Sequence, residues 1–393
     1  MDDFFEATDD IDTAVKIIED LRYVLQQGSF NLTEWITTDH RILQAIAEEH
    51  RSITIDEIND PKIFKRILGI RWRVSNDTLS FTTDKLHELF QKKPTQRNLL
   101  RAASSIFDPI GIAAPITIRL PIIQQAIWRK GMKWDDQMTR EMIPELFELL
   151  DERNDLQTVG IPQHYFGYSY DNIALHVFSA ASYSALAAVA HFVYSNSATR
   201  QICSAFVLGK ARVAPLKQHT ITKLELQAAV FGARLANFIR REQRTDINST
   251  HMWTDSTTAL QWIQGSDKRQ QIFVAHRVTE ILESTQASQW NHCPGPLNPA
   301  DDGTRGIPLS EFSNKSRWFT GPKFICEPEC NWPKLQLIDA NTDTLQLNDQ
   351  TGQMDEIATT PMLAFQASTE KTEQSFIDYS IFSKWTRNLR TTA

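Results

Sequence analysis

The chain has 393 residues, of which 41% are hydrophobic and 23% charged, and its formal net charge is -7. This length allows two or three globular domains, and the acidic balance argues against binding nucleic acid through the whole surface. Four cysteines are too few for a disulfide scaffold, the acidic start lacks a secretory signal, and no apolar run reaches the roughly 20 residues of a membrane span, so we expect an intracellular protein without membrane contact.

The first 160 residues predict helices around one small hairpin. Apolar residues at helical spacing predict a helix over 11–27, which Gly28 ends, followed by a strand near Phe30–Trp35. Alternating residues predict a strand over 66–74 that pairs with 77–82 through a turn. The remaining elements expected here are helices over 97–107, 115–131 and 136–153. Two local basic clusters in this part are Lys92, Lys93, Arg97 and Arg101, and Arg129, Lys130 and Lys133.

Beyond residue 160 the pattern changes to strands alternating with helices. It predicts an α/β layout in which antiparallel strands come first and parallel strands follow. The expected strands are 172–179, 185–194, 202–209, 249–254 and 287–292, and the expected helices are 222–242, 256–264 and 270–286. The polar segment 336–370 is typical of a flexible linker.

Three acidic residues fall where this layout would bring side chains together. Asp255 follows the strand 249–254 directly, Asp301 opens a helix after the last strand, and Glu225 lies near the start of the long helix. Carboxylates gathered in one crevice can hold two Mg²⁺ ions about 3.5–4 Å apart for phosphodiester hydrolysis. Taken singly, each has a simpler interpretation: Asp255 and Asp301 as helix caps, and Glu225 as a surface acid near a helix dipole.

Five blocks of sequence resemble the ribonuclease-H-like domain of BEL/Pao-type retrotransposons. The first, Leu175–Ser182, is similar to the family's Leu-His-Gly-Phe-Ser-Asp-Ala-Ser. The others follow in the family's order: Lys210–Lys217 with Ile221–Leu226, Trp253–Ser256, Phe273–Val278, and Asn298–Asp301 with Arg305-Gly306. The resemblance implies that Glu225, Asp255 and Asp301 are catalytic Mg²⁺ ligands.

Upstream segments resemble the end of a reverse transcriptase. Gly28–Leu32 with Trp35 is similar to the end of the palm, and Leu68–Trp72 to the primer-grip hairpin. Ile106–Gly111 and Trp134-Asp135 are similar to the thumb and connection region, which carries the label of the Pao retrotransposon peptidase family. No Asp-Thr/Ser-Gly occurs, so we expect no aspartic peptidase chemistry.

The resemblance implies a specific architecture and function. The expected fold is α/β (α+β), a truncated reverse-transcriptase palm, thumb and connection followed by a ribonuclease-H-like mixed five-stranded sheet. The expected domains are 1–85 (palm remnant), 86–160 (thumb and connection), 161–312 (ribonuclease-H-like) and 313–393 (a following segment towards an integrase). The implied activities are RNA-directed DNA synthesis and RNA cleavage in RNA–DNA hybrids. Implied partners are that hybrid and other segments of the retroelement polyprotein.

Two departures from the family indicate an inactive copy. Ala180 stands where the family has the first metal-binding Asp, and a methyl group cannot bind Mg²⁺. Asp2 and Asp3 resemble the end of the Tyr-x-Asp-Asp turn of the polymerase, or are simply an acidic terminus. If they are that turn, the chain begins inside the palm and the preceding polymerase segments are missing.

Three interpretations therefore stay open: an inactive retroelement fragment, a nucleic-acid-binding module that uses Lys210, Arg212 and Lys217, or an unrelated α/β enzyme. Two minor ones are zinc binding by His292, Cys293, Cys326 and Cys330, whose spacing fits no common finger, and a proton-transfer role for His292.

Overall fold

The computed structural model describes most of the first 334 residues, and all elements below belong to one compact unit, Phe5–Lys334. The described residues are Phe4, 6–8, 10–67, 70–81, 92–152, 159–166, 170–217, 219–243, 245–265 and 271–334. Asp2, Asp3 and the proposed linker 336–370 lie outside them. No helix in these ranges is long and apolar enough to cross a membrane.

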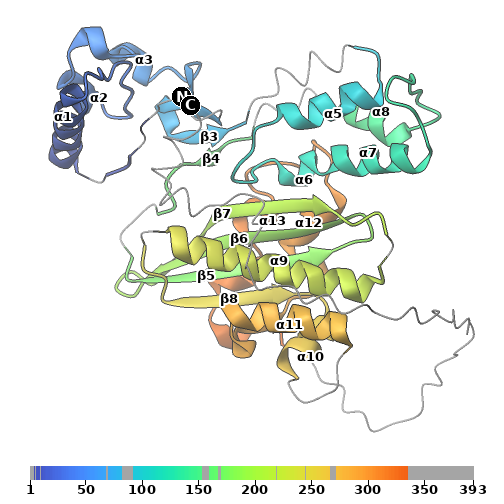
Figure 1. Ribbon diagram of the computed structural model, residues 1–393. Coiled ribbons are helices and arrows are strands. Elements are labelled where there is room, and N and C mark those ends of the chain that lie inside the picture. The colour runs from blue at the N-terminus through green and yellow to red at the C-terminus, as the bar shows by residue number, and fades with distance from the viewer. Residues whose placement is uncertain are drawn as a thin grey trace, which may run out of the picture. The chain divides into compact units, whose positions relative to one another are not determined.

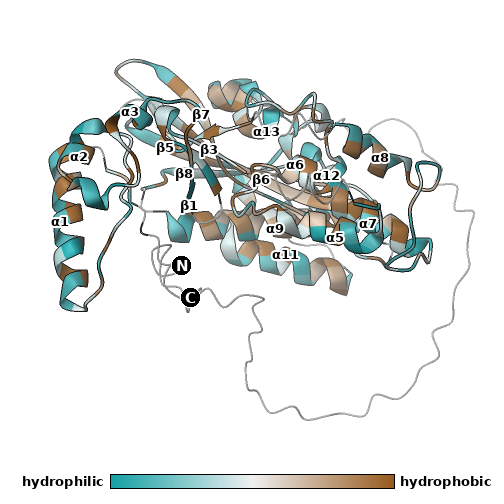
Figure 2. Ribbon diagram, turned by 90° about the horizontal axis from the view of Figure 1, so that it is seen from above, coloured by the Kyte–Doolittle hydropathy of each residue, from teal (hydrophilic) through white to brown (hydrophobic). Residues whose placement is uncertain are grey.

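The N-terminal part contains three helices and a small antiparallel sheet. Helix α1 (Ile11–Gln27) begins where the Asp10 carboxylate accepts the Thr13 backbone N–H at 2.8 Å, and it ends at Gly28 as predicted. Figure 2 shows hydrophilic and hydrophobic residues alternating along it, as expected of an amphipathic helix. The other elements are α2 (His40–Gln44), α3 (Ile55–Ile58), β1 (Phe64–Ile67), β2 (Ile70–Arg73), β3 (Thr78–Ser80) and β4 (Ile161–Pro162), with the strands in the order β1-β2-β3-β4.

Two strand predictions in this part are wrong. The segment near Phe30 forms no strand, and Trp35 makes only a single bridge with Arg51. The predicted strand 66–74 contains a chain reversal, because β1 ends at Ile67 and pairs it with Ile70 of β2. Alternation continues through both arms of this hairpin, so the period of two could not reveal the reversal. The predicted pairing with 77–82 is confirmed by the β2–β3 ladder.

The middle of the chain is helical, as predicted. It contains α5 (Gln96–Ser105), α6 (Ala114–Thr117), α7 (Arg119–Arg129) and α8 (Pro144–Asp151). The last helix is shorter than the predicted 136–153. It begins at Pro144 because proline fits the first turn of a helix, where its missing N–H has no partner to lose.

A mixed five-stranded sheet forms the largest part of the fold. Its order is β7-β6-β5-β8-β9, with antiparallel pairing from β7 to β5 and parallel pairing from β5 to β9. The strands are β5 (Asn172–Ala181), β6 (Ala185–Asn196), β7 (Gln201–Val213), β8 (Ser249–Thr254) and β9 (Trp290–His292), and the helices are α9 (Ile221–Glu242), α10 (Thr257–Gln264), α11 (Ile272–Ser284), α12 (Asp302–Arg305) and α13 (Arg317–Thr320). This sheet confirms the predicted mixed α/β arrangement.

Strand β5 is buried on both faces of the sheet. Its odd-numbered residues, such as Leu175 and Val177, pack in one core with α9 and α11. Its even-numbered residues, such as Phe178 and Ala180, pack in a second core that includes Trp318. Figure 1 shows α9 running across one face, with α12 and α13 behind the sheet. Burial on both faces explains why this strand is a nearly continuous apolar run.

The loop before α6 attaches the helical part to the sheet. The Gly209 N–H of β7 donates to the Ile110 carbonyl at 2.9 Å, and the Trp318 indole N–H donates to the Gly111 carbonyl at 3.0 Å. The Asp108 carboxylate closes the loop by accepting the backbone N–H groups of Ile112 and Ala113. One core thus runs from α5–α8 through the sheet to Trp318, while the domain boundaries near 85, 160 and 312 stay predictions.

Candidate functional site

The three predicted acids come from three separate elements. Asp255 follows β8, Glu225 is the fifth residue of α9 and thus lies just beyond its first turn, and Asp301 ends the short helical turn before α12. The Ser256 hydroxyl donates to the Glu225 carboxylate at 2.5 Å, which joins α9 to the end of β8. The tertiary fold therefore brings residues from positions far apart in the sequence to one end of the sheet.

Neither aspartate caps a helix through its side chain. The N-cap of α10 is Ser256, whose hydroxyl accepts the Ala259 N–H at 3.1 Å. Asp301 precedes α12, but its carboxylate makes no capping hydrogen bond. Asp301 instead has a buried Oδ1 atom without a hydrogen-bond partner, and its Oδ2 atom lies 4.0 Å from the Arg305 guanidinium. The capping interpretation of these two residues is wrong.

The acids act on one another electrostatically. Burial, together with the negative charges of Asp301 and Glu225, raises the pKa of the Asp255 carboxyl to about 6. Burial also raises the pKa of Asp301, against the effect of Arg305 and Arg317. The three residues thus form an acidic site that would favour a proton or a cation.

Ala180 lies near the point where β8 ends. The parallel register pairs Ser179 with Thr254, and Ala180 and Asp255 are the next residues along the two segments. Ala180 is only 1% exposed and belongs to the same core as Ala300 and Cys293. The nearby hydroxyls are engaged elsewhere: Ser179 donates to the Trp253 carbonyl, and Ser182 to the Thr304 carbonyl. No neighbour among these replaces the missing carboxylate.

The acids fit a magnesium site only in part. Their carboxylate oxygens are the ligand type that Mg²⁺ prefers, and the unpartnered Oδ1 of Asp301 is an acceptor that a cation would satisfy. Yet within the described ranges no three His, Cys, Asp or Glu residues are grouped closely enough to hold a metal ion. This also counts against the zinc interpretation.

Two further groups lie beside the acids: Arg317, which the sequence does not indicate, and His292, for which it suggests a proton-transfer role. Arg317 forms an ion pair with the buried Asp302 at 2.6 Å and donates to the Pro296 carbonyl. His292 is paired with Thr254, its ring is hydrogen-bonded to the Asp255 backbone, and burial lowers its pKa. The fourteen residues between Asp302 and Arg317 follow no helical or strand period, so no local signal indicates the ion pair.

The raised pKa of Asp255 predicts a pH-dependent stability. The pKa of Asp255 in the folded chain exceeds that of an unfolded aspartate, so folding favours the protonated carboxyl. The stability that the protonated carboxyl contributes is lost as pH rises through about 6. Asp255→Asn should therefore raise the free energy of unfolding by about 2 kcal/mol at pH 8 and by little at pH 4. Urea titrations of both proteins at these two pH values measure the difference. A difference independent of pH would contradict the shift. Asp108, whose pKa burial raises to about 6, is present in both proteins and cancels.

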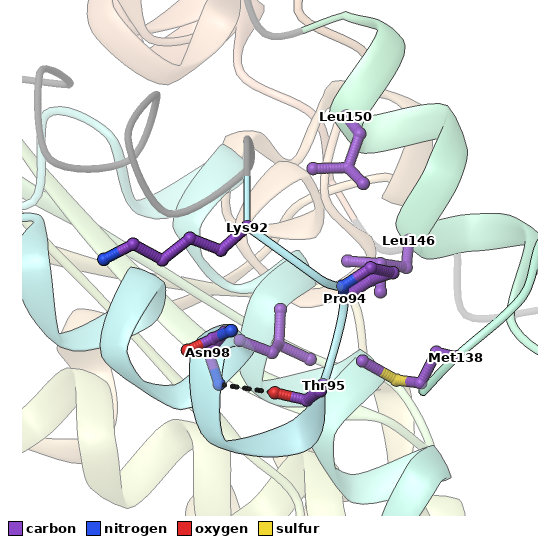
Figure 3. A pocket seen from close by; sticks show the side chains of 8 residues that line it. Lys92, Pro94, Thr95, Asn98, Met138, Leu146 and Leu150 are labelled. Carbon is purple, nitrogen blue, oxygen red and sulfur yellow. Dashed lines mark hydrogen bonds between the residues drawn. The ribbon is translucent and has the colours of Figure 1, made fainter. Parts of the chain in front are cut away.

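Two cavities lie away from the acids. The larger, about 470 Å³, opens between α6, the loop before it, β7 and α9, and Lys210 and Arg212 are among its lining residues. Burial lowers the pKa of Lys210, whose ammonium lies 5.2 Å from the centre of the Phe238 ring. Lys217, which was grouped with them, is exposed and does not line this cavity. The smaller cavity, beside Thr95 and Asn98 (Figure 3), has about 20 Å³, enough for one water molecule.

Comparisons with known proteins identify part of the chain. No curated protein matches it. One similar solved structure is RNase H1 from Halobacterium salinarum NRC-1, with 12% sequence identity, a TM-score of 0.23, and coverage of 33% of this chain and 91% of that one. Another is an N-terminal RNase H domain from Mycobacterium tuberculosis, with 12% sequence identity, a TM-score of 0.23, and coverage of 34% of this chain and 94% of that one. A third is LC11-RNase H1 in complex with an RNA/DNA hybrid (14%, 33% and 92%, 0.21). These TM-scores are too low to add to the argument.

The family comparison is more specific. The matching family model is described as the Pao retrotransposon-like RNaseH-like domain, and it covers residues 95–256. The match begins at the N-cap of α5 and ends just after β8. It therefore includes helices α5 to α9 and four of the five strands of the mixed sheet. Residues 95–256 of this chain therefore match the model of the Pao retrotransposon-like RNaseH-like domain.

Proposed function

We propose that this chain is the ribonuclease-H-like part of a retrotransposon polyprotein, and that its hydrolytic site is inactive. The observation that carries the proposal is Ala180, an alanine one residue beyond the Ser179–Thr254 pair, where the family resemblance places a metal-binding aspartate. Glu225, Asp255 and Asp301 are the proposed remnant of a catalytic set for which Mg²⁺ is the cofactor. When bound, Mg²⁺ would stabilise the charge that develops during phosphodiester hydrolysis.

The missing carboxylate accounts for inactivity in physical terms. Removing one group that stabilises a transition state costs about 10²–10³ in rate, and a ligand shared between two metals costs more. Burial and the negative charges of Asp301 and Glu225 raise the pKa of Asp255. A proton therefore competes with a metal ion for the Asp255 carboxylate.

A cleavage assay tests this proposal. The full chain is incubated with an RNA–DNA hybrid and Mg²⁺ or Mn²⁺, beside an Asp255→Asn variant as the matched control. We expect no RNA cleavage above background from either protein. Robust cleavage that Asp255→Asn abolishes would overturn the proposal of inactivity while supporting the assignment of the site.

The N-terminal part of the chain extends the same proposal. Residues 1–85 would be the remnant of a reverse-transcriptase palm with its primer-grip hairpin, and 86–160, which overlap the start of the matched region, its thumb and connection. Asp2 and Asp3 would then be polymerase residues. Such a chain would work inside the cell, where its RNA and DNA substrates and the other polyprotein segments are present.

A second candidate function is nucleic-acid binding without catalysis. Lys210 and Arg212 line a cavity of about 470 Å³, and neither forms an ion pair with a carboxylate within the part of the chain that the structure describes. Unpaired cations at the edge of a cavity are suited to phosphate groups.

Charge removal at this cavity tests the second candidate. We expect the double variant Lys210→Gln, Arg212→Gln to bind an RNA–DNA hybrid more weakly, with a salt dependence reduced by about 0.9 per lost phosphate contact. Filter binding at two salt concentrations measures both effects, and Arg200→Gln, an exposed residue beyond the far end of β7, is the control. Equal affinity of all three proteins would exclude these two residues from binding.

A further inference from the structure

Two tryptophans lie exposed and in contact at the end of α7. Trp128 is 55% exposed and Trp134 is 41% exposed, and their ring centroids are 6.3 Å apart in an edge-to-face arrangement. Tryptophan is the most costly side chain to leave in water, and exposed aromatic pairs are typical of interaction surfaces. This pair of tryptophans is not part of the acidic site described above.

The pair is held in place by the surrounding backbone. The Arg97 N–H of α5 donates to the Trp134 carbonyl at 3.0 Å, and the Arg97 guanidinium forms two hydrogen bonds with Asp135 at 2.8 and 2.9 Å. The Lys133 N–H donates to the Asp136 carboxylate at 2.8 Å. The rings therefore stand on a fixed turn, which reduces the entropy lost when a ligand binds.

The surroundings of the pair are basic although the chain is acidic. Five exposed cations lie on these segments against the two carboxylates Asp135 and Asp136: Arg97, Arg101, Arg129, Lys130 and Lys133. Arg101 acts electrostatically on Asp135, so the α5 cations belong to the same surface as the turn. The formal net charge of the whole chain is -7, so this local excess of positive charge stands out from the rest of the protein. Such a surface is suited to an anionic partner.

We propose that Trp128 and Trp134, with these cations, form a binding surface for single-stranded RNA or DNA. Unpaired bases offer free π-faces that stack on exposed aromatic rings, while the cations contact the phosphates. A duplex does not offer such faces, because its bases already stack on one another. The proposal deepens the retroelement function proposed above and rests on it for nucleic acid as the ligand class, but it uses residues remote in sequence from the acids.

Single substitutions in the full chain test the stacking. We expect Trp128→Leu and Trp134→Leu each to weaken binding of a 12-nucleotide single strand by about 5- to 100-fold, since one stacked base contributes about 1–3 kcal/mol. Trp128→Phe keeps an aromatic face and should retain most of the affinity. Tyr23→Leu removes an aromatic residue that is 67% exposed on α1 and should have no effect. Fluorescence anisotropy measures the affinity, and tryptophan quenching by the strand reports contact with the rings.

The charges are tested separately. Arg129→Gln should reduce the salt dependence of single-strand binding by about 0.7, the value expected for one phosphate contact, whereas Arg200→Gln should not. Unchanged affinity and quenching in both tryptophan variants would overturn the proposal. So would self-association of the chain that Trp128→Leu abolishes, because the pair would then bind a second copy. Hybrid binding that depends on Lys210 and Arg212 is measured independently, so the failure of one proposal is distinguishable from that of the other.

Discussion

Ala180→Asp is expected to raise the rate of RNA cleavage in an RNA–DNA hybrid by about 10²–10³ in the presence of Mg²⁺. The new carboxylate would stand beside Asp255 and complete a set of four acids with Glu225 and Asp301. The measurement is the initial cleavage rate of the variant against the parent chain, at equal protein concentration and with excess hybrid.

The same substitution has a second expected effect that does not depend on activity. Without metal, a carboxylate at this position should lower the melting temperature, because Ala180 is only 1% exposed and the new charge would be desolvated and repelled by Asp255. Added Mg²⁺ should restore stability to Ala180→Asp, and much less to the parent chain or to Ala180→Asn, which has the same size without the charge. If Mg²⁺ neither stabilises Ala180→Asp nor permits cleavage, the three remaining acids do not form a metal site.

Gly111→Ala is expected to lower the free energy of unfolding by about 3 kcal/mol or more. Gly111 has a φ of +75°, and a Cβ atom there would lie 1.9 Å from the Gly209 carbonyl oxygen of β7. The loop would have to move away from the sheet and lose the hydrogen bonds from Gly209 to Ile110 and from Trp318 to Gly111. Urea unfolding followed by tryptophan fluorescence measures the change.

Gly131→Ala is the matched control for this substitution. Gly131 has a φ of +68°, but a Cβ atom there meets nothing within 4 Å. It should therefore cost only the backbone strain of a left-handed alanine, about 1 kcal/mol. Equal losses at the two positions would mean that the close approach of the loop to β7 does not contribute to stability.

The main elements could be predicted because their signals are local. Helix α9 has an apolar stripe at a period of 3.6, and the buried strand β5 is a nearly continuous apolar run. The order of these elements was enough to predict a mixed sheet. Local signals failed where two structures share one pattern, as in the β1–β2 hairpin, where alternation continues across the reversal.

What the sequence determined by itself is the identity and order of the groups: an α/β chain with acids after β8, near the start of α9 and before α12, and an alanine at position 180 of β5. Only the tertiary structure decided which groups meet. It joined Ser256 to Glu225, paired Asp302 with Arg317, and set Ala180 beside Asp255. The physical reason is that a period describes neighbours within one helix or strand, whereas burial, raised pKa values and ion pairs arise between elements that the chain brings together only on folding.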